Sequence, residues 1–250
     1  MRPPVDTILA PAFAKRARWI RPAAHSASHA SAASTQALLV AFWDVCQPSS
    51  LRTLPYLTAW HERYGARGLR IVAAHAPSSD AGRDEDQVTA AVSALEIGFE
   101  VMLDTDFALW QDYENPGWPA RYVLASGMRL VDVHFGEGGY TEAERAIQDL
   151  IGSEDDLVAP VRAIDVADAM IVVPSADQAG AYCGPYAAGE VWVDVASTGT
   201  LAVNGVDVRI DRIGAHQVVA NETHVVAEID LRPAPGLAIT RTLFGPGIAP

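Results

Sequence analysis

The chain has 250 residues, 50% of them hydrophobic, and carries a formal net charge of −13. This length suffices for one large domain or two small ones, and the negative charge argues against nucleic acid or an anionic membrane as a partner. Two cysteines are too few for the disulfide framework of a secreted protein.

The first 26 residues place charges and prolines where a signal peptide needs an unbroken apolar core. No stretch of the sequence approaches the roughly 20 apolar residues of a membrane span. We therefore expect a cytoplasmic protein. Residues 25–35 are small and polar and are expected to form an exposed loop.

The first predicted elements are two strands joined by a helix. Residues 37–43 form a continuous apolar run, which is typical of a parallel strand covered on both faces, and residues 69–77 have the same character. Strand, helix and strand in this order predict a right-handed parallel unit. Between the two runs, apolar side chains recur with the period of a helix packed by one face: Leu51, Leu54, Leu57, Trp60 and Tyr64.

A further strand, a hairpin and three helices are predicted next. The hairpin spans 120–135 and turns at Ser126–Gly127. Thr141 and Glu144 match a capping box, so we expect Thr141 to cap the last helix. The other elements are expected at 88–95 (helix), 99–104 (strand) and 106–113 (short helix).

Beyond residue 168 the sequence has no helical period. Short strand-like runs follow at regular intervals, among them 216–219 and 224–231 as separate strands. Asn204–Gly205 between alternating apolar residues is a strong signal for a two-residue hairpin turn. This spacing predicts a small all-β sandwich or barrel over 168–250.

Residues 8–152 resemble the thioredoxin-like redoxins, in particular those in which a W-x-x-x-C-x-x-C-L-R-T-L-P-Y segment opens the first long helix. Trp43 and residues 51–56 match this segment without a gap. The resemblance implies an α/β thioredoxin-like fold, with a mixed central sheet flanked by helices, followed by the β region. The predicted organisation is an N-terminal extension and loop (1–35), a thioredoxin-like domain (36–155), a linker (156–167) and a C-terminal β domain (168–250).

The same match places Gln47 and Ser50 where the family carries its nucleophilic and resolving cysteines. An amide cannot attack a disulfide, and a hydroxyl group forms no disulfide. The sequence therefore predicts that this protein is not a standard thiol-disulfide oxidoreductase. Whether it is an enzyme of another kind stays open.

Cys46 lies one residue before the family's nucleophile and admits two interpretations. It is a candidate catalytic residue if a helix N-terminus or a cation lowers the pKa of its thiol. It is a small buried apolar residue otherwise, and cysteines outside disulfides are among the most buried residue types. We favour the second interpretation. Cys183 is interpreted as a loop cysteine.

A ligand pocket is predicted at the carboxyl ends of the parallel strands, where connections diverge. The resemblance implies a cis peptide bond at Trp118–Pro119 beside it. Trp118 either stacks on a ligand or packs on Trp43 or Trp110. His75 is either an acid or base or a structural residue. Glu137 either lies in the pocket or lies only near the last helix. The candidate pocket residues are Trp43, Gln47, Ser49, Ser50, Arg52, His75, Trp118, Pro119 and Glu137.

Three functions remain after these steps. The first is a thioredoxin-like protein that has lost dithiol exchange and binds a small molecule or a peptide in the retained pocket. The second is a monothiol redox protein that uses Cys46, and the third is a non-redox enzyme that reuses the pocket. The sequence has no metal-ligand cluster and no nucleotide-binding loop, so we expect neither a metal nor a cofactor.

Overall fold

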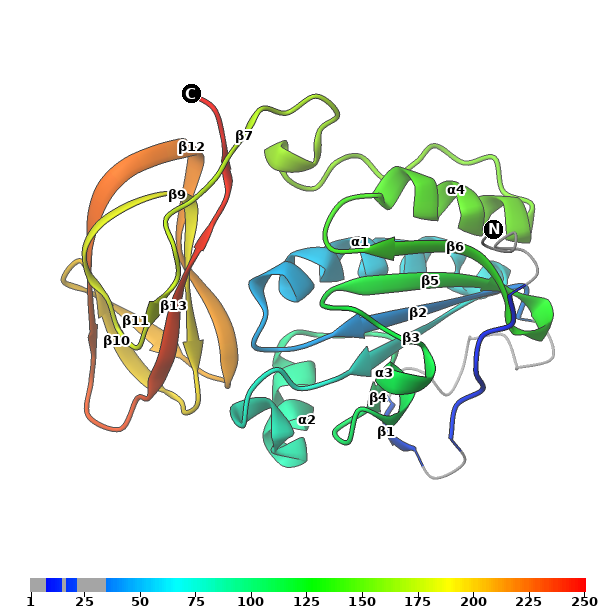
Figure 1. Ribbon diagram of the computed structural model, residues 1–250, viewed down its shortest axis with the longest axis horizontal. Helices are drawn as coiled ribbons and strands as arrows, with labels where there is room; N and C mark the ends of the chain where they lie inside the picture. The colour runs from blue at the N-terminus through cyan, green and yellow to red at the C-terminus, as the bar shows by residue number, and fades with distance from the viewer. Residues whose placement is uncertain (1–7, 15–16, 22–34) are drawn as a thin grey trace. The chain divides into compact units, whose positions relative to one another are not determined.

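The computed structural model describes residues 8–14, 17–21 and 35–250 (Figure 1). Most of the loop predicted over 25–35 lies outside these residues, as does much of the N-terminal segment considered as a signal peptide. The chain forms two compact units, which we describe separately. Unit 1 comprises the described residues up to Asp44 together with 49–77 and 95–159, and unit 2 comprises 45–48, 78–94 and 160–250.

A mixed sheet forms the centre of unit 1. Its described strands lie in the order β1-β4-β3-β2-β5-β6. The strand β2 is parallel to β3 and antiparallel to β5, and β3 is parallel to β4. The bounds are Arg18–Ile20 (β1), Ala37–Trp43 (β2), Leu69–His75 (β3), Glu100–Leu103 (β4), Ala120–Ala125 (β5) and Arg129–Phe135 (β6).

Every residue of β2 is buried, as the apolar run predicts for a strand covered on both faces. On one face, Leu38, Val40 and Phe42 belong to a core that also contains Leu109 and Tyr113 of the α3 region. On the helical side, the Tyr64 hydroxyl of α1 donates to Glu144 of α4 over 2.7 Å. The α-helices of the described residues are α1 (Pro48–Tyr64), α2 (Glu85–Ala94), α3 (Ala108–Asp112) and α4 (Tyr140–Ile151).

The thioredoxin-like fold predicted from the sequence is confirmed by this order of strands and helices. Two details differ. The strand β1, which pairs antiparallel with β4, was not predicted. The predicted capping box is wrong, because α4 begins at Tyr140 after Gly139 in the left-handed conformation (φ 60°), so that Thr141 lies inside the first turn.

Unit 2 contains an antiparallel sheet in the order β11-β10-β12-β9-β13-β8 and a separate pair, β14-β7. Alternate residues of its long strand β9 face the core of the unit, among them Val191, Val193 and Val195. The all-β character predicted for this region is therefore confirmed. The bounds are Ile171–Val172 (β7), Gln178–Ala179 (β8), Cys183–Val195 (β9), Gly199–Val203 (β10), Val206–Ile210 (β11), Gly214–Pro233 (β12), Ile239–Gly245 (β13) and Gly247–Ile248 (β14).

One turn and one strand of unit 2 show which features local sequence patterns predict. Asn204 and Gly205 have φ values of 49° and 81° and connect β10 to β11, as the hairpin signal predicts. The separate strands predicted at 216–219 and 224–231 are wrong, because both runs lie in β12, whose pairing with β9 shifts register between Ala220 and Val225. A bulge of this kind bends one strand without ending it.

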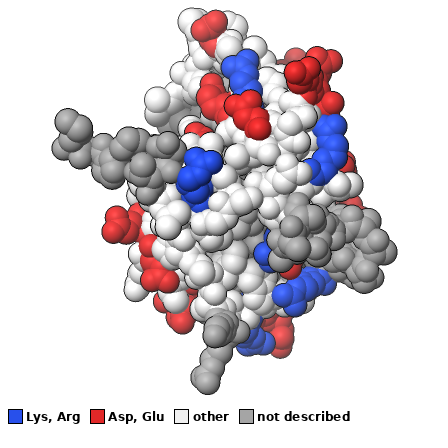
Figure 2. Space-filling view, turned by 90° about the vertical axis from the view of Figure 1, so that its right-hand side faces the viewer, with Lys and Arg blue, Asp and Glu red and all other residues white. Residues whose placement is uncertain are grey.

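Charged side chains are intermixed on the face shown in Figure 2. Acidic and basic residues lie among uncharged ones on that face. Among the described residues, no helix combines the length and the apolar character needed to cross a bilayer.

The stability of unit 2 is expected to fall in acid because of His216. Burial, reinforced by the charge of Arg212, lowers the pKa of His216 to about 4, and its Nε2 lies 2.9 Å from the Arg212 carbonyl oxygen. The unfolded chain binds the proton first, near pH 6.5. Stability is therefore lost as the pH falls from about 6.5 to about 4, by up to about 3 kcal/mol.

We expect His216→Gln to flatten this part of the pH profile. Chemical unfolding followed over this pH range measures the effect. An unchanged slope in the variant would show that other groups control the acid sensitivity.

Candidate functional site

The parallel pairing of β2 and β3 sets Trp43 opposite His75 at the carboxyl ends of both strands. The two rings meet edge to face with centroids 5.2 Å apart. The His75 Nε2 atom lies 3.2 Å from Asp44 Oδ1, and both side chains are buried, with 1% and 0% of their surface exposed. Asp44 and His75 thus form a buried pair that fixes the ends of the two strands.

Ser50 is fully buried in the first turn of α1. Its Oγ accepts a hydrogen bond from the backbone N–H of Asp44 over 3.1 Å. The neighbouring Ser49 carbonyl accepts from the Thr53 hydroxyl over 3.0 Å. The Ser50 hydroxyl is therefore part of the interior that connects α1 to the end of β2.

The Trp118–Pro119 peptide bond is cis. The Trp118 indole N–H donates to the Ala76 carbonyl over 2.9 Å, just beyond β3, and its ring packs on Trp110 with centroids 4.4 Å apart. The Pro119 carbonyl accepts from Gly136 N–H over 2.7 Å. This peptide bond is thus connected to the end of β3 and to the loop that follows β6.

Arg52 and Glu137 form a bidentate ion pair. The guanidinium group of Arg52 donates from Nε and Nη2 to the two carboxylate oxygens of Glu137 over 2.8 and 2.6 Å. The Arg52 side chain is 8% exposed and that of Glu137 is 25% exposed. Parallel donor and acceptor pairs of this kind are among the stronger hydrogen bonds in proteins.

Arg121, the second residue of β5, was not predicted as a site residue. It is fully buried, lies over the Tyr140 ring at 4.6 Å, and donates from Nη2 to the Gly138 carbonyl. Within the described part of the chain its Nε and Nη1 atoms have no hydrogen-bond partner. Burial lowers the pKa of Arg121. The signal in the sequence was an arginine inside an otherwise apolar strand.

Cys46 and Gln47 belong to unit 2. The Cys46 Sγ is buried and accepts from the Ser79 hydroxyl over 3.3 Å, and Gln47 Nε2 donates to the Ser78 hydroxyl over 2.9 Å. The backbone of this segment is also hydrogen-bonded, because the Cys46 carbonyl accepts from Arg241 Nη2 over 3.2 Å. Both side chains are therefore engaged within the protein.

Gly214 packs directly against the carbonyl of Val45, which leaves no room for a β-carbon, and its φ of 94° is a conformation that favours glycine. The next residue, Ala215, donates from its backbone N–H to the Val45 carbonyl over 2.8 Å. Cys183, at the start of β9, is exposed, and the charge of Asp230 raises the pKa of its thiol. Both cysteines lie in the described residues, and neither forms a disulfide.

The structure thus brings the predicted residues of unit 1 into two connected groups. Trp43, Ser50 and His75 surround the end of β2, while Arg52 and Glu137 meet beside the loop after β6. The Pro119 carbonyl connects that loop to the cis peptide bond. In the described residues no group of three histidine, cysteine or carboxylate side chains lies close enough to hold a metal ion.

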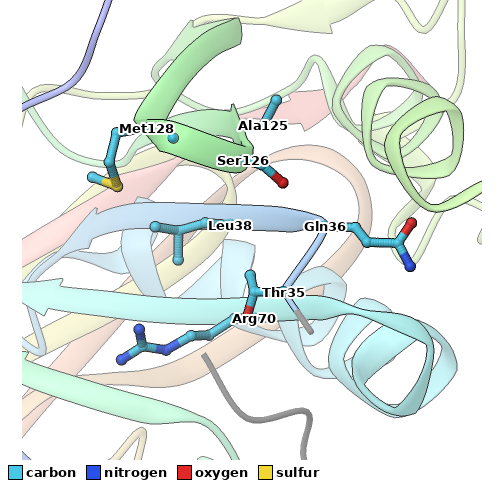
Figure 3. A pocket seen from close by; sticks show the side chains of 8 residues that line it. Thr35, Gln36, Leu38, Arg70, Ala125, Ser126 and Met128 are labelled. Atoms are coloured by element: carbon cyan, nitrogen blue, oxygen red, sulfur yellow. The ribbon is translucent and has the colours of Figure 1, made fainter. Parts of the chain in front are cut away.

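A hollow of about 330 Å³ lies at the other end of the strands (Figure 3). Arg70 beside it pairs with Glu100 over 2.7 Å. None of the predicted site residues lines it. Its lining residues are Thr35, Gln36, Leu38, Arg70, Ala125, Ser126, Gly127 and Met128.

Comparison with known proteins gives partial matches. The chain is 27% identical over 114 residues to Protein DipZ of Mycobacterium tuberculosis. The matched segment is 46% of this chain and 16% of that protein. It is 23% identical over 117 residues to the thiol-disulfide oxidoreductase YkuV of Bacillus subtilis, with coverages of 47% and 78%. A scan against models of protein families finds no match.

Solved structures match over similar lengths. A thioredoxin-like protein in the oxidized form has a TM-score of 0.45 at 20% identity and covers 60% of this chain and 95% of its own. The exposed lipoprotein thioredoxin of Streptococcus pneumoniae has a TM-score of 0.42 at 16% identity, and the match covers 47% of this chain and 87% of its own. The two cysteines of the sequence, Cys46 and Cys183, do not form a C-x-x-C motif.

The two thiols are expected to react with a disulfide reagent at very different rates. In the native protein Cys183 reacts and Cys46 does not, because only the first is exposed. Since Asp230 raises the pKa of Cys183, its labelling speeds up with rising pH, and Asp230→Asn accelerates it at mildly alkaline pH. Absorbance of the released reagent measures both rates.

Cys183→Ser and Cys46→Ser are the matched pair of variants for this titration. The first should show no rapid native reaction and one thiol after unfolding. Rapid labelling of native Cys183→Ser protein would mean that Cys46 is accessible.

Proposed function

We propose that the protein binds a small molecule or a peptide beside the cis Trp118–Pro119 bond of unit 1 and has lost dithiol–disulfide exchange. The observation that carries this proposal is the buried hydrogen bond between the Ser50 hydroxyl and the Asp44 backbone N–H. At the position of a resolving thiol, the side chain serves the interior of the protein.

The chemistry of the other position supports the same proposal. Gln47 offers a carboxamide, which has neither an acidic proton nor a nucleophilic sulfur, and it is engaged by Ser78. Exchange between dithiols needs a thiolate that attacks and a second thiol that resolves the mixed disulfide. The sequence has no thiol at residue 47 or at residue 50. Bacillus YkuV, which resembles this chain, is named as a thiol-disulfide oxidoreductase.

Two features of unit 1 near the cis bond favour ligand binding. Trp118 offers a half-buried indole ring beside the cis bond. Arg52 and Glu137 offer a charged pair that is still partly exposed. An aromatic surface next to a few oriented polar groups is the usual composition of a small-molecule site.

No observation specifically supports the two alternatives, a monothiol redox protein and a non-redox enzyme. A monothiol reaction at Cys46 requires unit 2 to open, because the Sγ atom is buried and hydrogen-bonded. Acid or base chemistry at His75 meets a similar obstacle, since its side chain is 1% exposed and paired with Asp44. A cytoplasmic location, and the absence of nucleic acid and membrane among its partners, remain predictions.

Native mass spectrometry of the protein purified from its own host tests the binding part of the proposal. We expect a co-purifying ligand with the wild-type protein and its loss in Trp118→Ala. Trp19→Ala is the control, because Trp19 is also a half-buried tryptophan of unit 1. A ligand retained equally by all three proteins would place the binding site elsewhere.

The redox part of the proposal predicts a gain of function. Gln47→Cys combined with Ser50→Cys should create a dithiol that forms a disulfide and accelerates the reduction of a protein disulfide, because the helix start and the cis bond remain in place. The wild-type protein and each single variant should show no such acceleration. An assay of disulfide reduction with a small dithiol as the electron donor measures this, and equal activity of wild type and double variant would contradict the proposal.

A further inference from the structure

The loop between β6 and α4 supplies one carboxylate to a region with two arginines. Glu137 in this loop holds Arg52 through both oxygens, and the carbonyl of the adjacent Gly138 accepts from Arg121. We infer that the Glu137 carboxylate occupies the position of a ligand carboxylate, which displaces it and is held by Arg52 and Arg121. This inference rests on the proposed ligand site of unit 1.

Both arginines of this region are buried. Arg52 is 8% exposed and Arg121 is fully buried, so both guanidinium groups have lost most of their water. Glu137 pairs with Arg52, and Tyr140, Asp132 and Glu137 all interact electrostatically with Arg121. Buried charges in proteins are ordinarily paired, because an uncompensated one is costly. A ligand carboxylate that replaces Glu137 keeps Arg52 paired and adds acceptors beside Arg121.

Arg121 also lacks hydrogen-bond acceptors. Its Nη2 has the Gly138 carbonyl and its plane lies over the Tyr140 ring, but Nε and Nη1 have no acceptor in the described residues. A cation–π contact compensates part of the charge and satisfies neither N–H group. An arginine presents its donors as a fork that fits a carboxylate, so an incoming carboxylate supplies what these two nitrogens lack.

Solvent reaches the place beside Arg52 that the Glu137 carboxylate occupies, and the Glu137 side chain is able to move away from it. The Glu137 side chain is 25% exposed. Glu137 lies between Gly136 and Gly138, whose φ values are 86° and 85°, so the backbone on both sides has the freedom of glycine. The backbone of Gly136 is bonded to the Pro119 carbonyl, which connects this position to the proposed site.

The class of ligand follows from the Glu137 carboxylate, which Arg52 already holds. Arg52 grips the Glu137 carboxylate in a bidentate arrangement, so a second carboxylate fits the same donors. Such a group comes from a free small acid or from the C-terminus of a peptide. Acetate tests the shared chemistry, and a tripeptide with a free C-terminus compared with its amidated form tests the second source.

Glu137→Gln is the decisive variant, because it removes the internal competitor while keeping the size of a partly exposed side chain. We expect it to bind acetate at least about tenfold more tightly than the wild type, since hydrogen bonds to charged groups are strong. Arg121→Met in the same background should abolish the gain. Isothermal titration at constant ionic strength, with chloride as the balancing anion, measures the affinities.

Asp155→Asn is the matched control. It removes a carboxylate that also pairs with an arginine, Arg67, but both of these side chains are more than 40% exposed, at 49% and 43%. It should leave acetate binding unchanged. Unchanged affinity in Glu137→Gln would overturn the inference even if Arg121→Met fails to fold. Loss of the co-purifying ligand in Trp118→Ala would stand independently of that result, so the two proposals fail separately.

Discussion

The hydrogen bond from the Asp44 backbone N–H to Ser50 Oγ is the interaction on which this account of unit 1 depends. It connects the first turn of α1 to the end of β2, where the Asp44 carboxylate also pairs with His75 at 3.2 Å. Leaving a buried N–H group without its acceptor costs about 1–3 kcal/mol. The residue at position 50 is therefore under a structural demand, and a hydroxyl group meets it as an acceptor.

A second constraint is electrostatic. The sequence has an excess of 13 negative charges, yet Arg52 and Arg121 lie in the interior of unit 1, where Glu137 pairs with Arg52. Burying a guanidinium group costs free energy unless its charge and its donors find partners. We connect these buried donors to binding: a site that has given up thiols, as we propose, holds its ligand through oriented donors.

Local sequence patterns predicted most of the fold and only part of the site. The run 37–43 matches β2 to the residue, because burial on both faces leaves a continuous apolar signal. The strand β1 gave no such signal, since it has three residues and its stability comes from pairing with β4, far along the chain. Arg52 and Glu137 were both predicted to line the pocket, but their contact joins residues 85 positions apart, and no spacing rule reaches that far. Arg121 was missed because a buried arginine has meaning only once its surroundings are known.

The central claim is that this protein keeps the thioredoxin-like scaffold for binding and has lost its exchange chemistry. Its most direct test is the steady-state rate at which the wild-type protein reduces a protein disulfide when a small dithiol supplies the electrons. If exchange chemistry has been lost, disulfide reduction in the presence of the wild-type protein is as fast as with the reductant alone. A rate that rises in proportion to the protein concentration and disappears in Cys46→Ser would contradict it.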